Sequence, residues 1–114
     1  MDLTQPAETN SGRYWYNLHV VLTAHGRYRI GCEDALPRIR PAAQAWAAGS
    51  GGALKAFAVM PDHVHAALRG NVEKPPADIA QDLRTALNHA AGCVLYSDRM
   101  YVGTFSEYTL RALR

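Results

Sequence analysis

Two strand-like segments separated by a two-residue corner constrain this chain more than any other part of its sequence. Residues 53–60 predict one strand, Pro61-Asp62 predicts a corner, and residues 63–69 predict a second strand. The second strand places three apolar residues on one face: Val64, Ala66 and Leu68. Because successive side chains of a strand point to opposite faces, His63 and His65 must lie on the other face.

Apolar periodicity predicts the elements on either side of this pair of strands. Residues 14–23 are aromatic and β-branched, as in a strand, whereas two later segments repeat apolar residues every three or four positions, as in amphipathic helices. The second of these opens with Pro75-Pro76, which suits a first helical turn. The further elements are helices at 35–48 and from Pro75-Pro76 to near Gly92, a strand at 100–105, and a short final helix that begins at a capping box over 104–107.

The order of these elements is β-α-β-β-α-β followed by the terminal helix. This order predicts an α+β fold of the ferredoxin-like split-βαβ kind, with an antiparallel sheet of roughly four to five strands. Both long helices are expected on one face of the sheet, which leaves the other face available for a ligand. Because such folds serve nucleic-acid-binding, metal-binding and nuclease proteins alike, the architecture does not choose a function.

Length and composition fit a single domain. The 114 residues, 48% of them hydrophobic, can bury one core but not two. Residues 1–12 are mostly polar and predict a flexible N-terminal tail, and residues 13–114 predict the folded domain. The apolar stretches are shorter than the roughly 18 positions that a membrane span needs, so we expect a cytoplasmic protein with no membrane partner. Cys32 and Cys93 are expected to be reduced thiols.

The pair His63 and His65 is the main candidate for chemistry. In an extended strand their side chains share a face at a spacing of roughly 6–7 Å, and two neutral imidazoles on one face can share a metal ion. They can also be ordinary polar residues on the wet face of a sheet, and the pair alone leaves both interpretations open. The net charge of +2 argues only weakly for a polyanionic partner.

The wider pattern resembles the HUH single-strand DNA transposases with one catalytic tyrosine, which include the insertion-sequence-200 type and the REP-associated type. The resemblance rests on the aromatic opening strand, on the string Met-Pro-Asp-His-Val-His at 60–65, on the long helix that follows, and on Tyr-Val-Gly-Thr at 101–104 just before the final helix. It extends over about residues 14–114. It favours the metal-binding interpretation of the two histidines.

The resemblance implies a specific chemistry and specific partners. His63 and His65, with a third polar ligand, are expected to hold a divalent ion, Mg²⁺ or Mn²⁺, that polarises the scissile phosphate of single-stranded or hairpin DNA. A tyrosine hydroxyl then attacks phosphorus and gives a 5′-phosphotyrosine and a free 3′-OH, so that a strand is cut, held and rejoined. Family members work as homodimers. Imidazole ligands suit Mn²⁺ or Zn²⁺ better than Mg²⁺, which prefers oxygen.

The nucleophile is where this sequence departs from the family pattern. Alignment on residues 101–104 puts the catalytic tyrosine position near Leu113, and the usual glutamine or asparagine ligand would fall beyond Arg114. The tyrosine of the final helix is Tyr108, which is rotated about 140° from position 113 around a helix. Three alternatives stay open: Tyr108 acts from a repositioned helix, the tyrosine lies in a segment not present in this chain, or the chain is a degenerate member that binds hairpin single-stranded DNA and metal without catalysis.

Further basic and imidazole side chains are secondary candidates. His19 is expected to line the polar face of the sheet beside the histidine pair, with direct approach to the metal as the less favoured alternative, while His89 is expected to be structural and His25 to lie in a turn. A small zinc hydrolase is disfavoured because no acidic residue shows the spacing of the known zinc helices. The candidate DNA-binding residues are Arg13, Arg27, Arg29 and Arg69.

Overall fold

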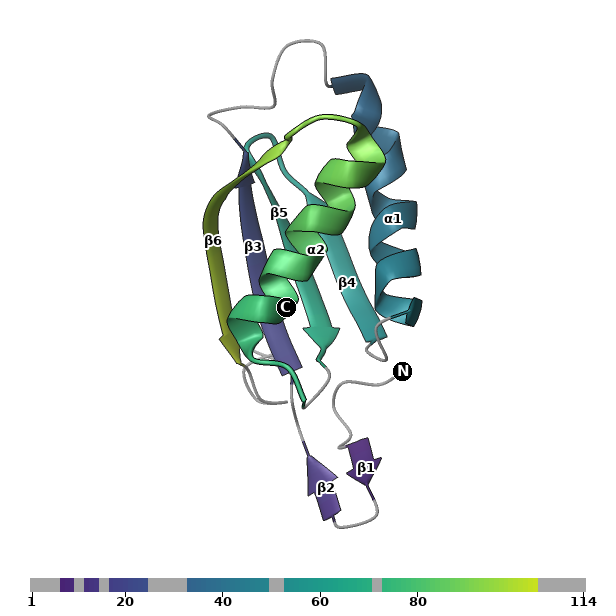
Figure 1. Cartoon of the computed structure of the whole chain (residues 1–114), viewed down its shortest axis with the longest axis vertical. Helices are drawn as coiled ribbons and strands as arrows, with labels where there is room; N and C mark the ends of the chain where they lie inside the picture. Colours follow the sequence, from purple (N-terminus) through teal and green to yellow (C-terminus); the bar gives the residue numbers. More distant parts are fainter. Residues whose placement is uncertain are drawn as a thin grey trace.

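A computed structural model of the chain describes residues 7–9, 12–14, 17–24, 33–49, 53–70 and 73–104. Its centre is an antiparallel four-stranded sheet in the order β4-β5-β3-β6 (Figure 1). The strands are β3 (Asn17–Ala24), β4 (Ala53–Val59), β5 (His63–Arg69) and β6 (Tyr96–Thr104). Two helices connect these strands: α1 (Leu36–Gly49), which follows the 3-10 helix η1 (Glu33–Ala35), and α2 (Pro76–Ala91).

This architecture confirms the predicted α+β fold with a split-βαβ order. The helices and the two strands around Pro61-Asp62 begin and end within one residue of the expected positions, whereas β6 starts at Tyr96, four residues before the predicted strand. The predicted terminal helix lies outside the described residues. A short antiparallel hairpin, β1 (Ala7–Thr9) with β2 (Gly12–Tyr14), includes part of the segment predicted as a flexible tail.

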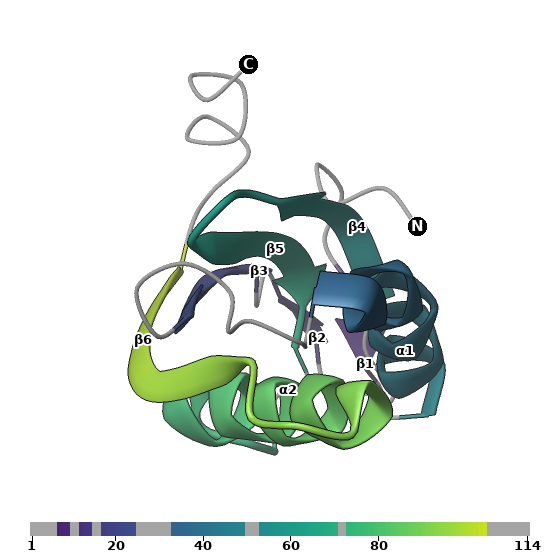
Figure 2. The same cartoon turned by 90° about the horizontal axis from the view of Figure 1, so that it is seen from above.

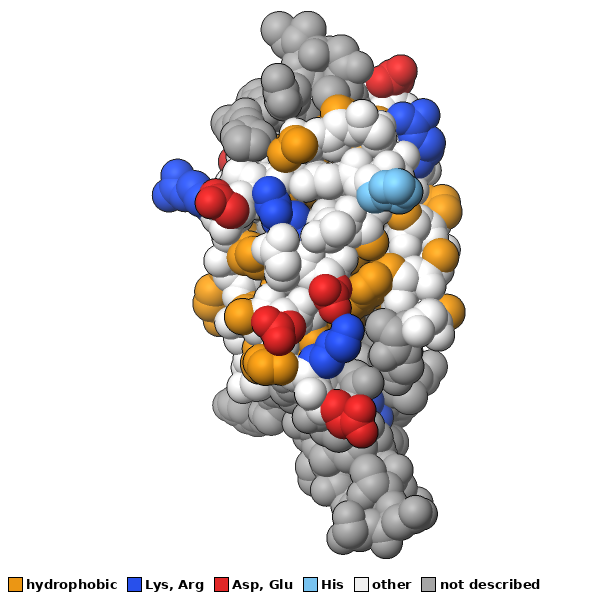
Figure 3. All heavy atoms as spheres, in the orientation of Figure 1, with side chains coloured by type: hydrophobic (Ala, Val, Ile, Leu, Met, Phe, Trp, Pro, Cys, Tyr) orange, Lys and Arg blue, Asp and Glu red, His pale blue; other side chains and the backbone are white. Residues whose placement is uncertain are grey.

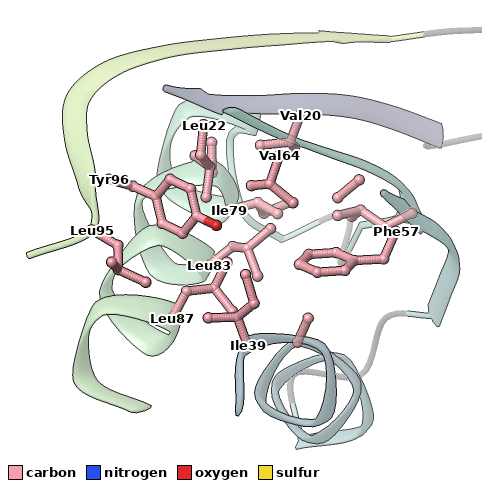
Figure 4. Packing of buried hydrophobic residues seen from close by; sticks show 14 of the residues in the cluster. Val20, Leu22, Ile39, Phe57, Val64, Ile79, Leu83, Leu87, Leu95 and Tyr96 are labelled. Atoms are coloured by element: carbon pink, nitrogen blue, oxygen red, sulfur yellow. The ribbon is translucent and has the colours of Figure 1, made fainter. Parts of the chain in front are cut away.

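Both helices cover the same face of the sheet, and the core lies between the two layers (Figures 1 and 2). Alternate residues of β3 and β5 supply the sheet side of this core, and the inner faces of α1 and α2 supply the other side (Figure 4). The fully buried side chains include Leu18, Val20, Leu22, Ile39, Val64, Leu83 and Leu87. Burial of one such aliphatic side chain contributes roughly 1.5–3 kcal/mol, so the core fixes which face of each strand points away from the helices.

The outer surface of the helical layer has mixed charge. Acidic and basic side chains alternate over this surface, interspersed with apolar ones (Figure 3). An ion pair between Lys74 Nζ and Asp82 Oδ2, 2.8 Å apart, neutralises one basic group there and raises the pKa of the lysine.

No helix in the described part of the chain is both long enough and apolar enough to cross a membrane.

The turn from α2 into β6 is held by a side chain of the helix. Gly92 ends α2 in the left-handed conformation, with φ 74°, which glycine adopts without a Cβ clash. The Asn88 Oδ1 then accepts hydrogen bonds from the backbone N–H groups of Leu95 and Tyr96, each at 3.0 Å, and its Nδ2 donates to the Tyr96 carbonyl. Asn88 therefore sets the point at which β6 enters the sheet.

Replacing Asn88 with alanine should lower the free energy of unfolding by about 1–3 kcal/mol, because two partly buried N–H groups lose their acceptor. Urea unfolding followed by circular dichroism measures this change. The matched control is Thr85→Ala, an exposed position three residues earlier on the same helix, where a change within about 0.5 kcal/mol is expected. Equal stability of the two variants would contradict the role given to Asn88.

Candidate metal and nucleic-acid site

The histidine pair lies on the face of the sheet that the helices leave uncovered. In β5, Val64 is fully buried in the core, so His63 and His65 point to the opposite face, where both are half-buried. The register of β3 against β5 sets Thr23 opposite His63 and Val21 opposite His65. The face predicted for the two histidines is therefore the one observed.

A third histidine reaches this pair from the neighbouring strand. His19 is two residues before Val21 on β3, and its Nε2 lies 2.9 Å from Nδ1 of His65. The two rings are stacked, with centroids 5.1 Å apart and an interplanar angle of 12°. His19 thus contacts the side of His65 that faces away from His63.

Four polar side chains form one hydrogen-bonded chain across this face. Asp62 Oδ1 contacts Nδ1 of His63, Nε2 of His63 lies 2.8 Å from Nε2 of His65, and Nδ1 of His65 contacts His19. The Asp62 side chain is 60% exposed, whereas that of His63 is 28% exposed. Both candidate ligands therefore have their Nδ1 atoms engaged and their Nε2 atoms directed at each other.

The hydrogen bonds restrict the tautomers of these imidazoles. An ionised carboxylate only accepts hydrogen bonds, so the contact with Asp62 puts the proton of neutral His63 on Nδ1 and leaves a lone pair on Nε2. His65 then has two choices. Its Nε2 can donate to His63 while its Nδ1 accepts from His19, or its Nδ1 can donate to His19, in which case two lone pairs face each other and attract a cation.

The separation of the two Nε2 atoms fits a shared metal ion. Adjacent ligands of an octahedral ion at about 2.1 Å are about 3.0 Å apart, close to the 2.8 Å between these atoms. Within the described ranges, no three His, Cys, Asp or Glu side chains are arranged to hold a metal ion. His63 and His65 can therefore supply two ligands, and a further ligand must come from elsewhere.

Burial and neighbouring positive charge keep His65 in the neutral form. Its pKa is lowered from the ordinary value of 6.5, first by burial and then by the charges of His63 and His19. Only a neutral imidazole can coordinate a metal ion. The environment of His65 therefore favours the form that binds metal.

Among the candidate DNA-binding residues, Arg69 is described in full. It is only 3% exposed and pairs in register with buried Asn17, whose Oδ1 accepts a hydrogen bond from its Nε at 3.2 Å. The strand β2 includes Arg13, but its side chain is outside the described part of the structure. Four further sequence candidates also lie outside the described residues: His25, Arg27, Arg29 and Tyr108. His89, for which a partly buried structural role was expected, is instead exposed on α2.

Sequence reasoning missed three features of this site. It did not anticipate that His19 contacts His65 directly, because that contact depends on strand register. It gave no role to Asp62, although a carboxylate next to a candidate ligand was a usable signal. It used Tyr101 as part of the string at 101–104, whereas the structure shows an exposed aromatic residue whose ring meets that of His19 edge to face, with centroids 6.0 Å apart.

Two solved structures share the fold of this chain. A crystal structure of a protein from Deinococcus radiodurans R1, described as a transposase, aligns with 94% of this chain and 92% of its own chain, with a TM-score of 0.75 and 20% identity. A REP-associated tyrosine transposase bound to a REP hairpin aligns with 85% of this chain and 61% of its own, with a TM-score of 0.66 and 13% identity. These likenesses show a shared fold.

The sequence itself identifies the family. The family model of IS200-like transposases matches residues 13–114, so the chain belongs to the IS200-like transposase family. No curated protein matches the sequence. The resemblance drawn from the string at 60–65 and from residues 101–104 is thereby confirmed.

The lowered pKa of His65 predicts how the metal-free protein responds to acid. The unfolded chain binds a proton at this position more readily than the folded protein, so the contribution of His65 to stability falls as the pH drops below 6.5. In an NMR titration of the imidazole signals, His65 should titrate below a histidine in an unstructured peptide. His63→Asn should move the midpoint upward without restoring it fully, because burial persists. A midpoint of 6.5 or above in the native protein would contradict this assignment.

Proposed function

We propose that the chain binds a divalent ion, Mg²⁺ or Mn²⁺, between Nε2 of His63 and Nε2 of His65, and that it cleaves and rejoins single-stranded or hairpin DNA. The observation that carries the proposal is the convergence of these two atoms, 2.8 Å apart, while both Nδ1 atoms are held by other side chains. The match to IS200-like transposases supports DNA as the substrate, and a relative of similar fold binds a REP hairpin.

Asp62 and His19 act as positioning residues in this proposal. Each engages the Nδ1 of one ligand, which fixes the ring orientation and directs Nε2 toward the shared point. When bound there, a divalent ion supplies Lewis acidity to an oxygen of the scissile phosphate. The lowered pKa of His65 keeps that imidazole available as a ligand near neutral pH.

The proposed chemical step is attack of a tyrosine hydroxyl on phosphorus. The tyrosine hydroxyl loses its proton, its oxygen forms a bond to phosphorus, and the bond from phosphorus to the 3′ oxygen breaks. The 3′ oxygen takes up a proton and leaves as a 3′-OH, so the step consumes no net proton. The product is a 5′-phosphotyrosine, and attack by a 3′-OH reverses the step. Tyr108 is the proposed nucleophile of this chain.

The four candidate arginines are assigned two different roles. Arg13, Arg27 and Arg29 are proposed to neutralise DNA phosphates, since their sequence positions flank β3, the central strand of the site. Arg69 was a fourth candidate, and its burial against Asn17 favours a role in which it positions the end of β3 against β5. A homodimer, as in the family, is proposed for the assembly.

A second candidate function is binding of metal and hairpin single-stranded DNA without cleavage. The alignment that puts Leu113 at the catalytic tyrosine position favours it. The two candidates share the metal site and differ in the covalent step, so separate measurements of metal binding and of covalent product distinguish them.

Metal binding should depend on the two central imidazoles. We expect His63→Ala and His65→Ala to abolish Mn²⁺ binding measured by isothermal titration calorimetry. His19→Ala should weaken it by about 10- to 100-fold, because the orientation of His65 loosens. The control is His89→Ala, which removes an exposed histidine from α2 and should leave the affinity unchanged. Binding that survives both central substitutions would refute the assigned metal site.

Cleavage is tested by incubating the protein with single-stranded hairpin DNA and Mn²⁺ or Mg²⁺ and by searching for a covalent protein–DNA band on a denaturing gel. The proposal expects a band that disappears in Tyr108→Phe, because the variant lacks the attacking hydroxyl. Tyr96→Phe is the control, since that residue is fully buried in the core. No band from the native protein with either metal, together with retained hairpin binding, would favour the non-catalytic candidate.

A further inference from the structure

Tyr101 lies in the same row of the uncovered face as His65, one of the two candidate ligands. On β6 it pairs in register with Val21 of β3, and Val21 pairs on its other side with His65 of β5. Paired residues of adjacent strands point to the same face, so these three side chains form one line across the sheet. Two strand spacings separate Tyr101 from His65, which amounts to about 10 Å between their backbones.

The ring of Tyr101 leans along its own strand and lies across Gly103. A Cβ atom added at Gly103 would collide with Oη of this ring and would lie 3.0 Å from its Cζ, so the absence of a side chain at Gly103 makes room for the ring. The Tyr101 and His19 rings meet edge to face, with centroids 6.0 Å apart and an interplanar angle of 71°. Tyr101 nevertheless remains 58% exposed, the most exposed of the large hydrophobic residues in the described part of the chain.

The neighbourhood of this ring suits a flat, uncharged group attached to a polyanion. The row through Tyr101 continues across Val21 and His65 to Ala58, and it contains no acidic side chain. The carboxylate next to the row, that of Asp62, is occupied by its contact with His63. A nucleobase has an aromatic face that can stack on this ring, and no carboxylate within the row repels the phosphates to which the base is attached.

We propose that Tyr101 is a stacking platform for one unpaired nucleobase of the DNA strand whose phosphate lies at His63 and His65. This inference rests on the proposed function and adds a specificity to it: the strand must be unpaired beside the site, because a base inside a duplex cannot reach the ring. Stacking of a base on an aromatic side chain is worth about 1–3 kcal/mol and tolerates any base sequence. The ring contributes through its aromatic face, and its hydroxyl is not required.

The test measures binding of a hairpin with a single-stranded flank in EDTA, so that metal binding does not contribute. Tyr101→Ala should weaken binding by about 5- to 100-fold, the equivalent of one lost stacking contact. Tyr101→Phe should bind within about twofold of the native protein, and Tyr101→Leu should fall between the two. Val94→Ala, which shortens an exposed apolar side chain before β6, is the matched control and should change nothing.

A fluorescent 2-aminopurine placed at successive flank positions locates the stacked base. One position should be quenched by the native protein and by Tyr101→Phe but not by Tyr101→Ala. Gly103→Ala provides a second variant that displaces the ring without removing it, and it should reduce the quenching while circular dichroism shows an intact fold.

Native binding by Tyr101→Ala, or equal loss in the alanine and phenylalanine variants, would overturn the stacking role. Loss of the covalent band in Tyr101→Phe with unchanged binding would overturn it too, since the residue would then be the nucleophile. If the native protein does not bind the hairpin in EDTA, the inference fails, whereas the proposed function still stands on Mn²⁺ binding and the covalent band.

Discussion

The antiparallel register between β3 and β5 is the constraint on which the site depends. It places Val21 opposite His65 and Ala67 opposite His19, and so brings two histidines that are 46 residues apart in the sequence into contact. A shift of one residue would turn every side chain of a strand to its other face, placing the imidazoles in the core and the aliphatic residues in water. Burial of Val64 and Val20 on the helical side excludes that shift, so the hydrophobic core determines the geometry of a polar site.

Periodicity was sufficient to predict the helices, the corner at Pro61-Asp62 and the face on which His63 and His65 lie. These features depend on local patterns of period 2 or 3.6 and on turn residues, all of which the sequence displays directly. The early start of β6 at Tyr96 was not predictable in this way. It depends on Asn88, a residue of the preceding helix, whose amide holds the first residues of the strand.

The contacts made by the residues around the two candidate ligands could not be predicted from local sequence pattern either. The contact of His19 with His65 and the burial of Arg69 against Asn17 both arise from pairing across strands, which one sequence does not specify. Arginine in a sequence suggests a phosphate contact, yet here the partner is an amide of the adjacent strand. The string at 60–65 was informative for the opposite reason: the two candidate ligands and the carboxylate that contacts one of them are close together in the chain.

The hydrogen-bonded chain from Asp62 to His19 has a consequence for proton counting. In one of the two tautomers that these contacts allow, His65 carries its proton on Nε2 and His19 donates to Nδ1 of His65. With an ion between the two Nε2 atoms, each of these protons would move to the other nitrogen of its own ring, and none would leave the protein. Occupation of the site would therefore change the tautomers of His65 and His19 and leave the number of protons on the protein unchanged.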